Sequence, residues 1–404
     1  MKSYLKKISL LLLLFIFSVQ AKAQFEGLRI SPDAKISLIT CSSGNDLYAV
    51  FGHSAVRVQD PSLGMDVIFN YGTFDFNEPN FYLKFAQGKL NYKLSAAHFQ
   101  DFVYSYAQDN RSVFEQELNL TPEQKQKYWL FLTNNYLPAN RFYLYDFFFD
   151  NCATRIRDGL EATFPDQIKY NIEHLDKDYS FRNLIDLYLP PQPWGDFGID
   201  LALGARIDRE ATPYEYMFLP DYLSEGFANA TIQQNGQAVL LTGKPVAVFT
   251  QEPAEQLFSL FTPIILCWFL FIAAAAVTLL DLKKSRRSRT FDFILFFAAG
   301  LLGIVMLLLW FATDHQATAN NFNLLWAIPT HVVVAFLLGK QVLPEWVRKY
   351  MAITGLITGI LTISWWILPQ EPHAAFIPLG LTLLLRAEYI AWFEKKKELV
   401  TAKV

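Results

Sequence analysis

The sequence predicts an α+β domain on the outer side of a membrane, followed by a five-helix transmembrane domain. Three observations predict this architecture: a secretory signal at the start, mixed strand and helix patterns after it, and an almost continuously apolar C-terminal part. Hydrophobic residues make up 52% of the 404 residues, and the mean hydropathy of +0.18 averages over two very different parts. The expected segments are 1–23 (signal peptide), 24–250 (outer domain), 257–393 (membrane helices) and 394–404 (cytoplasmic tail).

The first 23 residues have the three parts of a secretory signal. Three lysines precede an apolar core that runs from Ile8 to Val19, and Ala21-Lys22-Ala23 fits a small-x-small cleavage site. The core is short for a membrane span, so we expect cleavage before Gln24. An uncleaved anchor is the alternative.

Five apolar runs follow the outer domain, and the loops between them orient the chain. The runs cover 257–280, 291–313, 322–339, 351–368 and 374–393, each near the length of about 20 residues that a bilayer requires. Lys and Arg occur in 283–289, 340–349 and 395–397 but not in 314–316 or 371–373. Basic loops face the cytoplasm. The alternation therefore places residues 24–256 outside the cytoplasm, as the signal also requires.

The charge pattern excludes one class of partner and marks a few residues within the spans. The net charge is −3, and no basic stripe interleaved with aromatic residues predicts nucleic-acid binding. His331, Arg386 and Glu388 are ionisable residues inside the apolar runs, where such groups are costly. We expect the spans to anchor and present the outer domain.

The outer domain alternates between strand and helix signals. The patterns predict strands at 36–40, 53–59, 65–71, 113–118 and 141–149, with the second and third forming a hairpin. Helices are predicted over 99–107, over 121–135 behind a Thr121-Pro122-Glu123-Gln124 capping box, and after Asn151. Residues 190–220 are expected to be irregular, and 239–241 with 246–249 to form a hairpin.

Cys152 is the candidate nucleophile of this domain. Asn151 is a good N-cap, so the thiol should lie in the first turn of a helix, where the dipole favours a negative charge. A thiolate is the reactive form, and such a position lowers the thiol pKa. Backbone N–H groups of the same turn, with Asn151 or Tyr71 as support, could hold a developing oxyanion.

His53 is the candidate base, at the start of the second predicted strand and directly after Gly52. An imidazole there could take the thiol proton, and a third polar group usually fixes such a ring. Asn70, on the partner strand of the hairpin, is the first candidate for that role, ahead of Tyr71 and Asn45. No metal or cofactor is expected. The alternative for Cys152 is a disulfide with Cys41, which is the ordinary expectation for two thiols in an oxidising compartment.

Several motifs together resemble one bacterial family. They are Leu38-Ile39-Thr40-Cys41, Phe51-Gly52-His53-Ser54-Ala55-Val56-Arg57-Val58, Asn70-Tyr71-Gly72-Thr73-Phe74-Asp75-Phe76, Tyr145-Asp146-Phe147-Phe148-Phe149-Asp150-Asn151-Cys152-Ala153-Thr154, and the stretch from Trp194-Gly195-Asp196 to Pro220. This set is similar to the outer domain of the Lnb family of lipoprotein N-acyltransferases. The order of histidine before cysteine also resembles the circularly permuted papain-like fold, which includes the lecithin:retinol acyltransferases. Those enzymes have a second histidine where this chain offers Asn70.

The resemblance implies a cysteine acyltransferase of the inner membrane with its N-terminal domain in the periplasm. Cys152 would be the nucleophile and His53 the base, with a membrane phospholipid as acyl donor and a diacylated lipoprotein as acceptor. Two alternatives stay open: a cysteine hydrolase acting on peptidoglycan, and a non-catalytic membrane-anchored module in which Cys41 and Cys152 are bridged.

Overall fold

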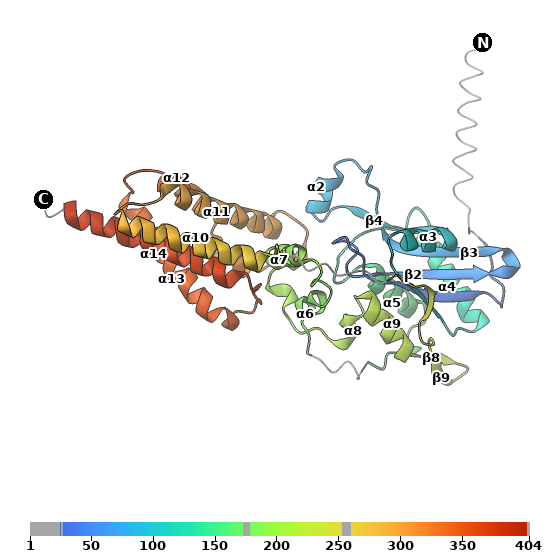
Figure 1. The fold of residues 1–404 in the computed structure, drawn as a ribbon. Coiled ribbons are helices and arrows are strands. Elements are labelled where there is room, and N and C mark those ends of the chain that lie inside the picture. Colours follow the sequence, from blue (N-terminus) through green and yellow to red (C-terminus); the bar gives the residue numbers. More distant parts are fainter. Residues whose placement is uncertain (1–24, 26, 173–177, 253–259, 402–404) are drawn as a thin grey trace, which may run out of the picture. The chain divides into compact units, whose positions relative to one another are not determined.

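The computed structural model describes residues 25, 27–172, 178–252 and 260–401, and its chain folds into two compact units (Figure 1). Unit 1 comprises residues up to Phe81, Leu90–Lys177 and Thr212–Pro253. Unit 2 comprises Tyr82–Lys89, Asp178–Ala211 and the chain from Ala254 onward. The expected signal peptide lies outside the described residues.

Unit 1 is built on a seven-stranded antiparallel sheet. The strand order is β10-β5-β1-β2-β3-β4-β6. The strands are β1 (Lys35–Cys41), β2 (His53–Asp60), β3 (Met65–Thr73), β4 (Asn91–His98), β5 (Val113–Glu117), β6 (Phe142–Leu144) and β10 (Val246–Phe249). The predicted hairpin is confirmed: β2 and β3 pair around a short 3₁₀ helix, η1 (Pro61–Leu63), which Asp60 caps from its N-terminal side.

Helices cover both faces of this sheet because its strands alternate apolar side chains between them. Val56 and Phe69 pack on one face against α4 (Pro122–Tyr136) and α5 (Cys152–Thr163). Ala55 and Ile68, their neighbours in sequence, pack on the other face with α3 (Phe99–Gln108). The capping box predicted at Thr121 is present at the start of α4. Unit 1 therefore has one buried apolar layer on each face of the sheet.

Three predictions for this domain were wrong. The strand expected at 141–149 is confined to β6, because Asp146 and Asp150 pair with each other and turn the chain. The hairpin expected at 239–249 does not form: β9 (Gln237–Leu240) pairs with β8 (Thr231–Gln234), whereas β10 pairs with β5. Residues 190–220 are largely helical. They contain α7 (Pro193–Ala202), η2 (Ala205–Ile207) and α8 (Pro213–Tyr216), and α9 (Pro220–Asn229) follows.

The remaining elements of unit 1 complete a second, smaller sheet. The short strand β7 (Ile168–Lys169) pairs with β8, giving the order β7-β8-β9. Leu223 and Phe227 of α9 are buried in the same core as α4 and α5. This core therefore extends from the large sheet to the small one.

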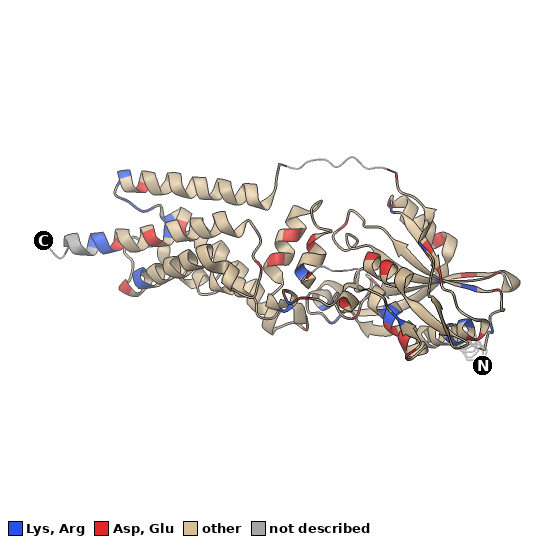
Figure 2. Cartoon of the chain, turned by 90° about the horizontal axis from the view of Figure 1, so that it is seen from below, with Lys and Arg blue, Asp and Glu red and all other residues tan. Residues whose placement is uncertain are grey.

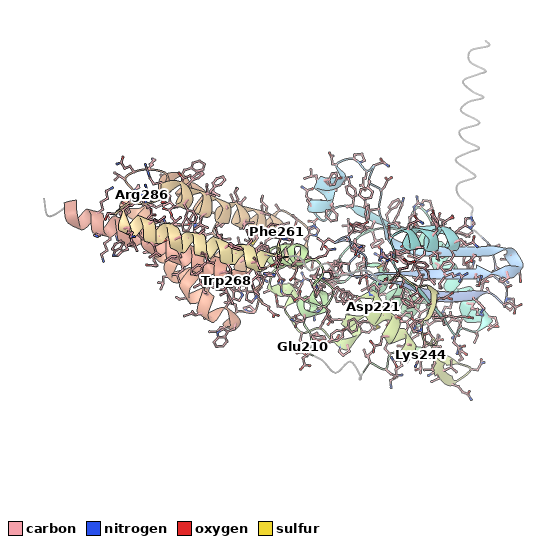
Figure 3. The ribbon with its side chains drawn as sticks, viewed as in Figure 1. Glu210, Asp221, Lys244, Phe261, Trp268 and Arg286 are labelled. Carbon is pink, nitrogen blue, oxygen red and sulfur yellow. The ribbon has the colours of Figure 1, made fainter. Side chains whose placement is uncertain are left out.

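Within its described residues, unit 2 contains four helices that are long and apolar enough to cross a membrane. They are α10 (Pro263–Lys283), α11 (Arg289–Phe311), α13 (Glu345–Ser364), which η5 (Trp365–Ile367) continues, and α14 (Phe376–Thr401). Phe261 and Arg286 flank opposite ends of α10, so the basic 283–289 loop lies at one end of this helix, as the expected alternation of basic and non-basic loops requires (Figure 3). Most Lys and Arg residues of the bundle lie at the end that holds the 283–289 loop, where the cartoon is coloured blue (Figure 2).

The third apolar run, 322–339, does not form one long helix. It contains η4 (Phe322–Leu325) and the eight-residue α12 (His331–Leu338), which rises only about 12 Å against a bilayer core of about 30 Å. Pro329 lies between the two pieces, and the residue before a proline disfavours helix. A Cβ at Gly303 would lie 1.8 Å from the Ala327 carbonyl oxygen, so this stretch rests directly on the α11 backbone.

The chain from residue 316 to residue 338 nevertheless runs the length of α11 in the opposite direction. The Thr318 hydroxyl, in η3 (Gln316–Thr318), donates to the Leu309 carbonyl near the end of α11. At the other end, Arg287 donates to the Leu338 carbonyl at 2.7 Å. The chain therefore passes five times along the bundle, with four continuous helices and one interrupted helix, and the expected alternation of the loops is preserved.

Residues 178–211 pack within unit 2 beside the loops of the membrane helices. They contain α6 (Phe181–Asp186) and α7, and Arg182 pairs with both Asp200 and Asp208. Side-chain amides tie this segment to the bundle: Asn321 donates to the Leu201 carbonyl at 2.7 Å. The chain of α2 (Phe81–Ala86) begins in unit 1 and continues in unit 2.

Candidate active site

Cys152 is the first residue of α5, a helix that packs against β2 (Figure 1). Its side chain is only 7% exposed. Asn151 is an extended N-cap whose Oδ1 accepts from the N–H groups of Ala153 and Thr154 at 2.8 and 2.9 Å. The Thr154 hydroxyl accepts in return from the Asn151 N–H, which completes a capping box. The thiol therefore starts a well-fixed helix, as the sequence predicted.

The same hydrogen bonds give Asn151 a structural role, whereas the sequence suggested that it could also support an oxyanion. Its Nδ2 donates to the Phe147 and Phe218 carbonyls at 2.7 and 2.8 Å, so the whole amide is used within the fold. Because the Ala153 and Thr154 amides already donate to Asn151, they are engaged before any substrate arrives. Asn151 therefore positions the start of α5.

His53 begins β2 directly opposite Cys41 of β1. Gly52, just before it, has φ +78°, and a Cβ there would lie 2.8 Å from the Cys41 carbonyl oxygen. A side chain at this position would be strained and would also clash with β1. Glycine thus allows the chain to enter β2 close against its neighbour, and it sets the position of the imidazole.

Asn70 holds the imidazole from strand β3. The His53 Nε2 and Asn70 Oδ1 atoms lie 2.6 Å apart. Because a carboxamide oxygen can only accept, this contact places a proton on Nε2 and leaves Nδ1 for the thiol. The β3–β4 ladder shifts register between Asn70 and Thr73, a local irregularity beside the site. The structure therefore brings Cys152, His53 and Asn70 together.

The buried pair of Cys152 and His53 has the electrostatics of an ion pair. Burial alone would raise the pKa of Cys152, but the His53 charge and hydrogen bond, with backbone N–H groups of Ser54 and Ala153, lower it below its usual value. Burial would likewise lower the pKa of His53, but the Cys152 charge and the hydrogen bonds to Cys152 and Asn70 raise it. Both shifts favour a thiolate beside an imidazolium.

Tyr71, the other support residue suggested by sequence, lies in the apolar core. It is 2% exposed and packs with the cluster that joins the sheet to α4 and α5. Burial raises its pKa, so it stays a neutral phenol. Asn45 is an exposed residue, and it is Asn70 whose oxygen faces the His53 ring.

Three tyrosines around the dyad were not identified from sequence. The Tyr106 ring of α3 stacks on His53 with centroids 6.3 Å apart and a 15° interplanar angle. Tyr143 and Tyr145 lie beside Gly72 together with Cys152, and burial, followed by the Cys152 charge, raises the pKa of each. The aromatic run at 142–149 was the available signal, but its strand-like pattern favoured a role in the core.

Cys41 and Cys152 are free, buried thiols, as is Cys267 in α10. Burial raises the pKa of Cys41, and the Tyr106 hydroxyl bonds to it. Cys41 is therefore a small buried residue next to Cys152 and Tyr106. The bridge required by the non-catalytic alternative is not formed.

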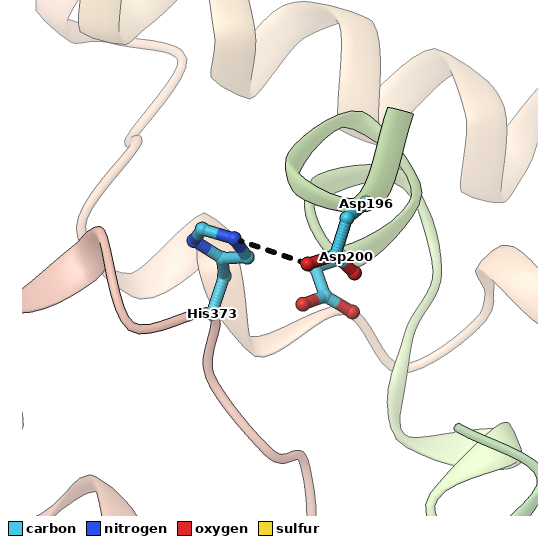
Figure 4. Close-up of side chains that lie close together, drawn as sticks. All are labelled: Asp196, Asp200 and His373. Carbon is cyan, nitrogen blue, oxygen red and sulfur yellow. Dashed lines mark ion pairs between the residues drawn. The ribbon is translucent and has the colours of Figure 1, made fainter. Parts of the chain in front are cut away.

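A second polar cluster lies in unit 2, where Asp196, Asp200 and His373 approach one another (Figure 4). The His373 Nδ1 accepts the Ala375 N–H at 3.0 Å, which leaves the ring proton on Nε2, 3.5 Å from Asp196. An Nε2 that carries a proton offers no lone pair to a metal. Burial raises the pKa of Asp200 to about 6, against the opposing effect of Arg182. The contact of the His373 Nε2–H with Asp196 and the ion pair of Arg182 with Asp200 account for the arrangement.

Comparison with known protein families gives a match for the N-terminal domain and another for the membrane helices. Residues 28–185 match the Lnb N-terminal periplasmic domain, and residues 254–398 match the Lnb transmembrane domain. Searches of curated proteins and of solved structures found no match. The matched ranges include the Cys152–His53–Asn70 site and every membrane helix. The chain therefore belongs to the Lnb family: it is a multi-pass inner-membrane protein with a periplasmic N-terminal domain, and its domains are those of lipoprotein-modifying membrane proteins.

Proposed function

We propose that this protein transfers a fatty acyl chain from a membrane phospholipid to the N-terminal amine of a diacylglyceryl-cysteine lipoprotein, by way of a thioester on Cys152. The observation that carries the proposal is the buried Cys152–His53 pair, in which the thiol pKa is lowered and the imidazole pKa is raised. A thiolate of this kind is a nucleophile suited to an ester carbonyl.

In the first half-reaction the Cys152 thiolate attacks the carbonyl carbon of the donor ester. A carbon–sulfur bond forms, and the carbonyl π electrons move to oxygen. When the intermediate collapses, the carbon–oxygen ester bond breaks. The lysophospholipid alkoxide takes a proton from the His53 imidazolium. The products are an acyl-thioester on Cys152, a neutral His53 and a lysophospholipid alcohol.

In the second half-reaction the neutral α-amine of the lipoprotein attacks the thioester. His53 now accepts a proton from the amine as the carbon–nitrogen bond forms and the carbon–sulfur bond breaks. The starting thiolate and imidazolium are restored together with the amide product. Asn70 keeps His53 Nε2 protonated throughout, so that Nδ1 faces the reacting atoms. The donor ester already carries the acyl group, so the scheme includes no cofactor.

The membrane helices support a lipid donor and a lipid-anchored acceptor, because a bilayer presents both to a site on its periplasmic side. A cell-wall hydrolase could use the same residues but needs at most a membrane tether. The free thiols of Cys41 and Cys152 support a reactive nucleophile over a structural bridge.

The test replaces Cys152 by Ala in cells that have no other lipoprotein N-acyltransferase. The matched control is Cys267→Ala, which removes a buried thiol from α10. Mass spectrometry of lipoprotein N-termini should show triacylated forms with the wild type and the control but only diacylated forms with C152A. Triacylation that persists in C152A would overturn the proposal.

A second measurement separates transfer from hydrolysis. Intact-mass analysis of the purified protein with phosphatidylethanolamine vesicles should detect one fatty acyl group on Cys152. Adding a diacylated lipopeptide should discharge that group onto the peptide amine. Release of free fatty acid, or of peptides from purified cell wall, would instead favour a hydrolase.

A further inference from the structure

Tyr143 carries a buried hydroxyl group with no hydrogen-bond partner among the described residues. It is the central residue of β6, pairs with Tyr92 of β4 in the sheet, and is 8% exposed. Burial and then the Cys152 charge raise its pKa, so the phenol keeps its proton. A buried donor without a partner is unfavourable in a folded protein, which indicates a function for this hydroxyl group.

Tyr143 shares a small space with the nucleophile. A Cβ placed on Gly72 would lie 3.9 Å from the Tyr143 hydroxyl, 3.9 Å from the Cys152 Cβ and 3.5 Å from the Tyr145 ring. These are ordinary contact distances, so the position above Gly72 has room for one additional heavy atom. Gly72 has φ +86°, a conformation that favours glycine and keeps the position free of a side chain.

The surroundings of Tyr143 also favour hydrogen-bond donation. The Arg155 guanidinium lies over its ring, 3.9 Å from the centroid, and is itself paired with Asp150. A cation on the ring face draws electron density from the phenol and strengthens its O–H as a donor. The helix amides that sequence suggested as donors, those of Ala153 and Thr154, already donate to Asn151.

We infer that the Tyr143 hydroxyl donates a hydrogen bond to the oxyanion that forms when Cys152 attacks a carbonyl, with that oxygen seated above Gly72. This inference rests on the proposed function. In both half-reactions the carbonyl π electrons move to this oxygen, and they return when the alkoxide or the thiolate leaves. Tyr143 keeps its proton, so the proton balance between His53, the leaving alcohol and the attacking amine is unchanged. A preorganised donor of this kind acts on the transition state and not on the resting thiolate.

The test uses Tyr143→Phe in the full-length protein, with Tyr128→Phe as the matched control. Tyr128 is also buried, and its hydroxyl group has no hydrogen-bond partner among the described residues, but it lies on α4 in the apolar core. Two reactions of Cys152 are measured: alkylation by iodoacetamide, which forms no oxyanion, and acylation, which does. Acylation is followed with phosphatidylethanolamine vesicles and with 4-nitrophenyl acetate.

Tyr143→Phe should slow acylation by about 100- to 1,000-fold, as expected for loss of one oxyanion donor. The rate and pH dependence of alkylation should match the wild type, and Tyr128→Phe should behave as the wild type in both reactions. Acylation of Y143F at the wild-type rate would overturn the inference and leave the proposed function standing. Equal slowing of alkylation and acylation would also overturn it, because Tyr143 would then act on the thiol.

The activated ester separates the two proposals. If 4-nitrophenyl acetate acylates wild-type Cys152 but phospholipid does not, the proposed donor is wrong. The comparison of Y143F with wild type on the activated ester still decides the role of Tyr143. Gly72→Ala offers an independent check: its methyl group would occupy the oxyanion position, so acylation should fall while alkylation is retained.

Discussion

Replacing Asn70 by Ala should move the ionisation of the whole site, because it removes the partner of His53 Nε2 at 2.6 Å. Hydrogen bonds to charged groups contribute about 1.5–3 kcal/mol. At about 1.4 kcal/mol for each tenfold change in an equilibrium, the half-ionisation point moves by roughly one to two pH units. The pKa of His53 falls and, as the imidazolium becomes rarer, the pKa of Cys152 rises. The thiolate therefore forms at higher pH than in the wild type.

The assay is the rate of iodoacetamide alkylation of Cys152 between pH 4 and pH 10. Below its onset, the wild-type rate should exceed that of N70A by about tenfold to a hundredfold, following the same pH shift. Asn70→Asp should move the onset to lower pH, since a carboxylate stabilises the imidazolium further. Asn140→Ala, in an exposed loop, is the control. A folded N70A protein with the wild-type alkylation profile would refute the reasoning.

Three further predictions concern stability, each measured by thermal unfolding of the full-length protein. Gly52→Ala should destabilise the protein by about 1–2 kcal/mol because of the left-handed backbone, and its clash with β1 should add to this loss. Gly64→Ala, at φ +61° with no atom within 4 Å of a Cβ, should show the backbone cost alone. Equal losses of stability in the two variants would show that β1 shifts to accommodate the methyl group. Arg386→Met should cost about 3–5 kcal/mol, because it removes the closer partner of the buried Asp292 carboxylate, at 2.7 Å, and leaves only Arg287 at 3.5 Å. Adding Asp292→Asn should recover part of the loss, and no recovery would contradict the ion-pair explanation. Burial and neighbouring carboxylates raise the pKa of Asp186 to about 8, so the folded state binds this proton more tightly and its stability should rise as pH falls from 8 toward 4. Asp186→Asn should flatten this pH dependence. An unchanged slope of stability against pH would exclude Asp186 as its source.

Local rules predicted the central part of the fold. The hairpin of β2 and β3 followed from strict alternation around a turn, and the starts of α4 and α5 followed from capping residues at Thr121 and Asn151. The predictions were wrong where a strand pairs with a segment that is distant in the sequence. Val246–Phe249 pairs with β5, more than a hundred residues earlier, and no local pattern specifies that choice. The third membrane run was apolar enough for a span, but its packing on Gly300 and Gly303 depends on a neighbouring helix.

Some residues of the candidate site could also be predicted from local sequence, and others could not. Cys152 and His53 could be proposed because their immediate neighbours, an N-cap and a glycine, have a local physical meaning. Asn70 followed from the hairpin, since pairing places it near the start of β2. Tyr106 and Tyr143 come from α3 and β6, so only tertiary packing brings them to the dyad. Their aromatic rings resemble core residues in sequence, and the unpartnered Tyr143 hydroxyl is visible only in three dimensions.

The packing of residues 178–211 with the membrane bundle has a practical consequence for anyone dissecting this protein. A single cut after residue 250 would not yield a self-sufficient water-soluble enzyme, because α6 and α7 would lose Asn321 and Gln370, which hydrogen-bond to the Leu201 and Leu203 carbonyls. That fragment would expose surfaces that normally pack against the loops between the membrane helices, and it would tend to aggregate. A well-behaved periplasmic fragment needs a short linker in place of 178–211, joining Lys177 to Thr212.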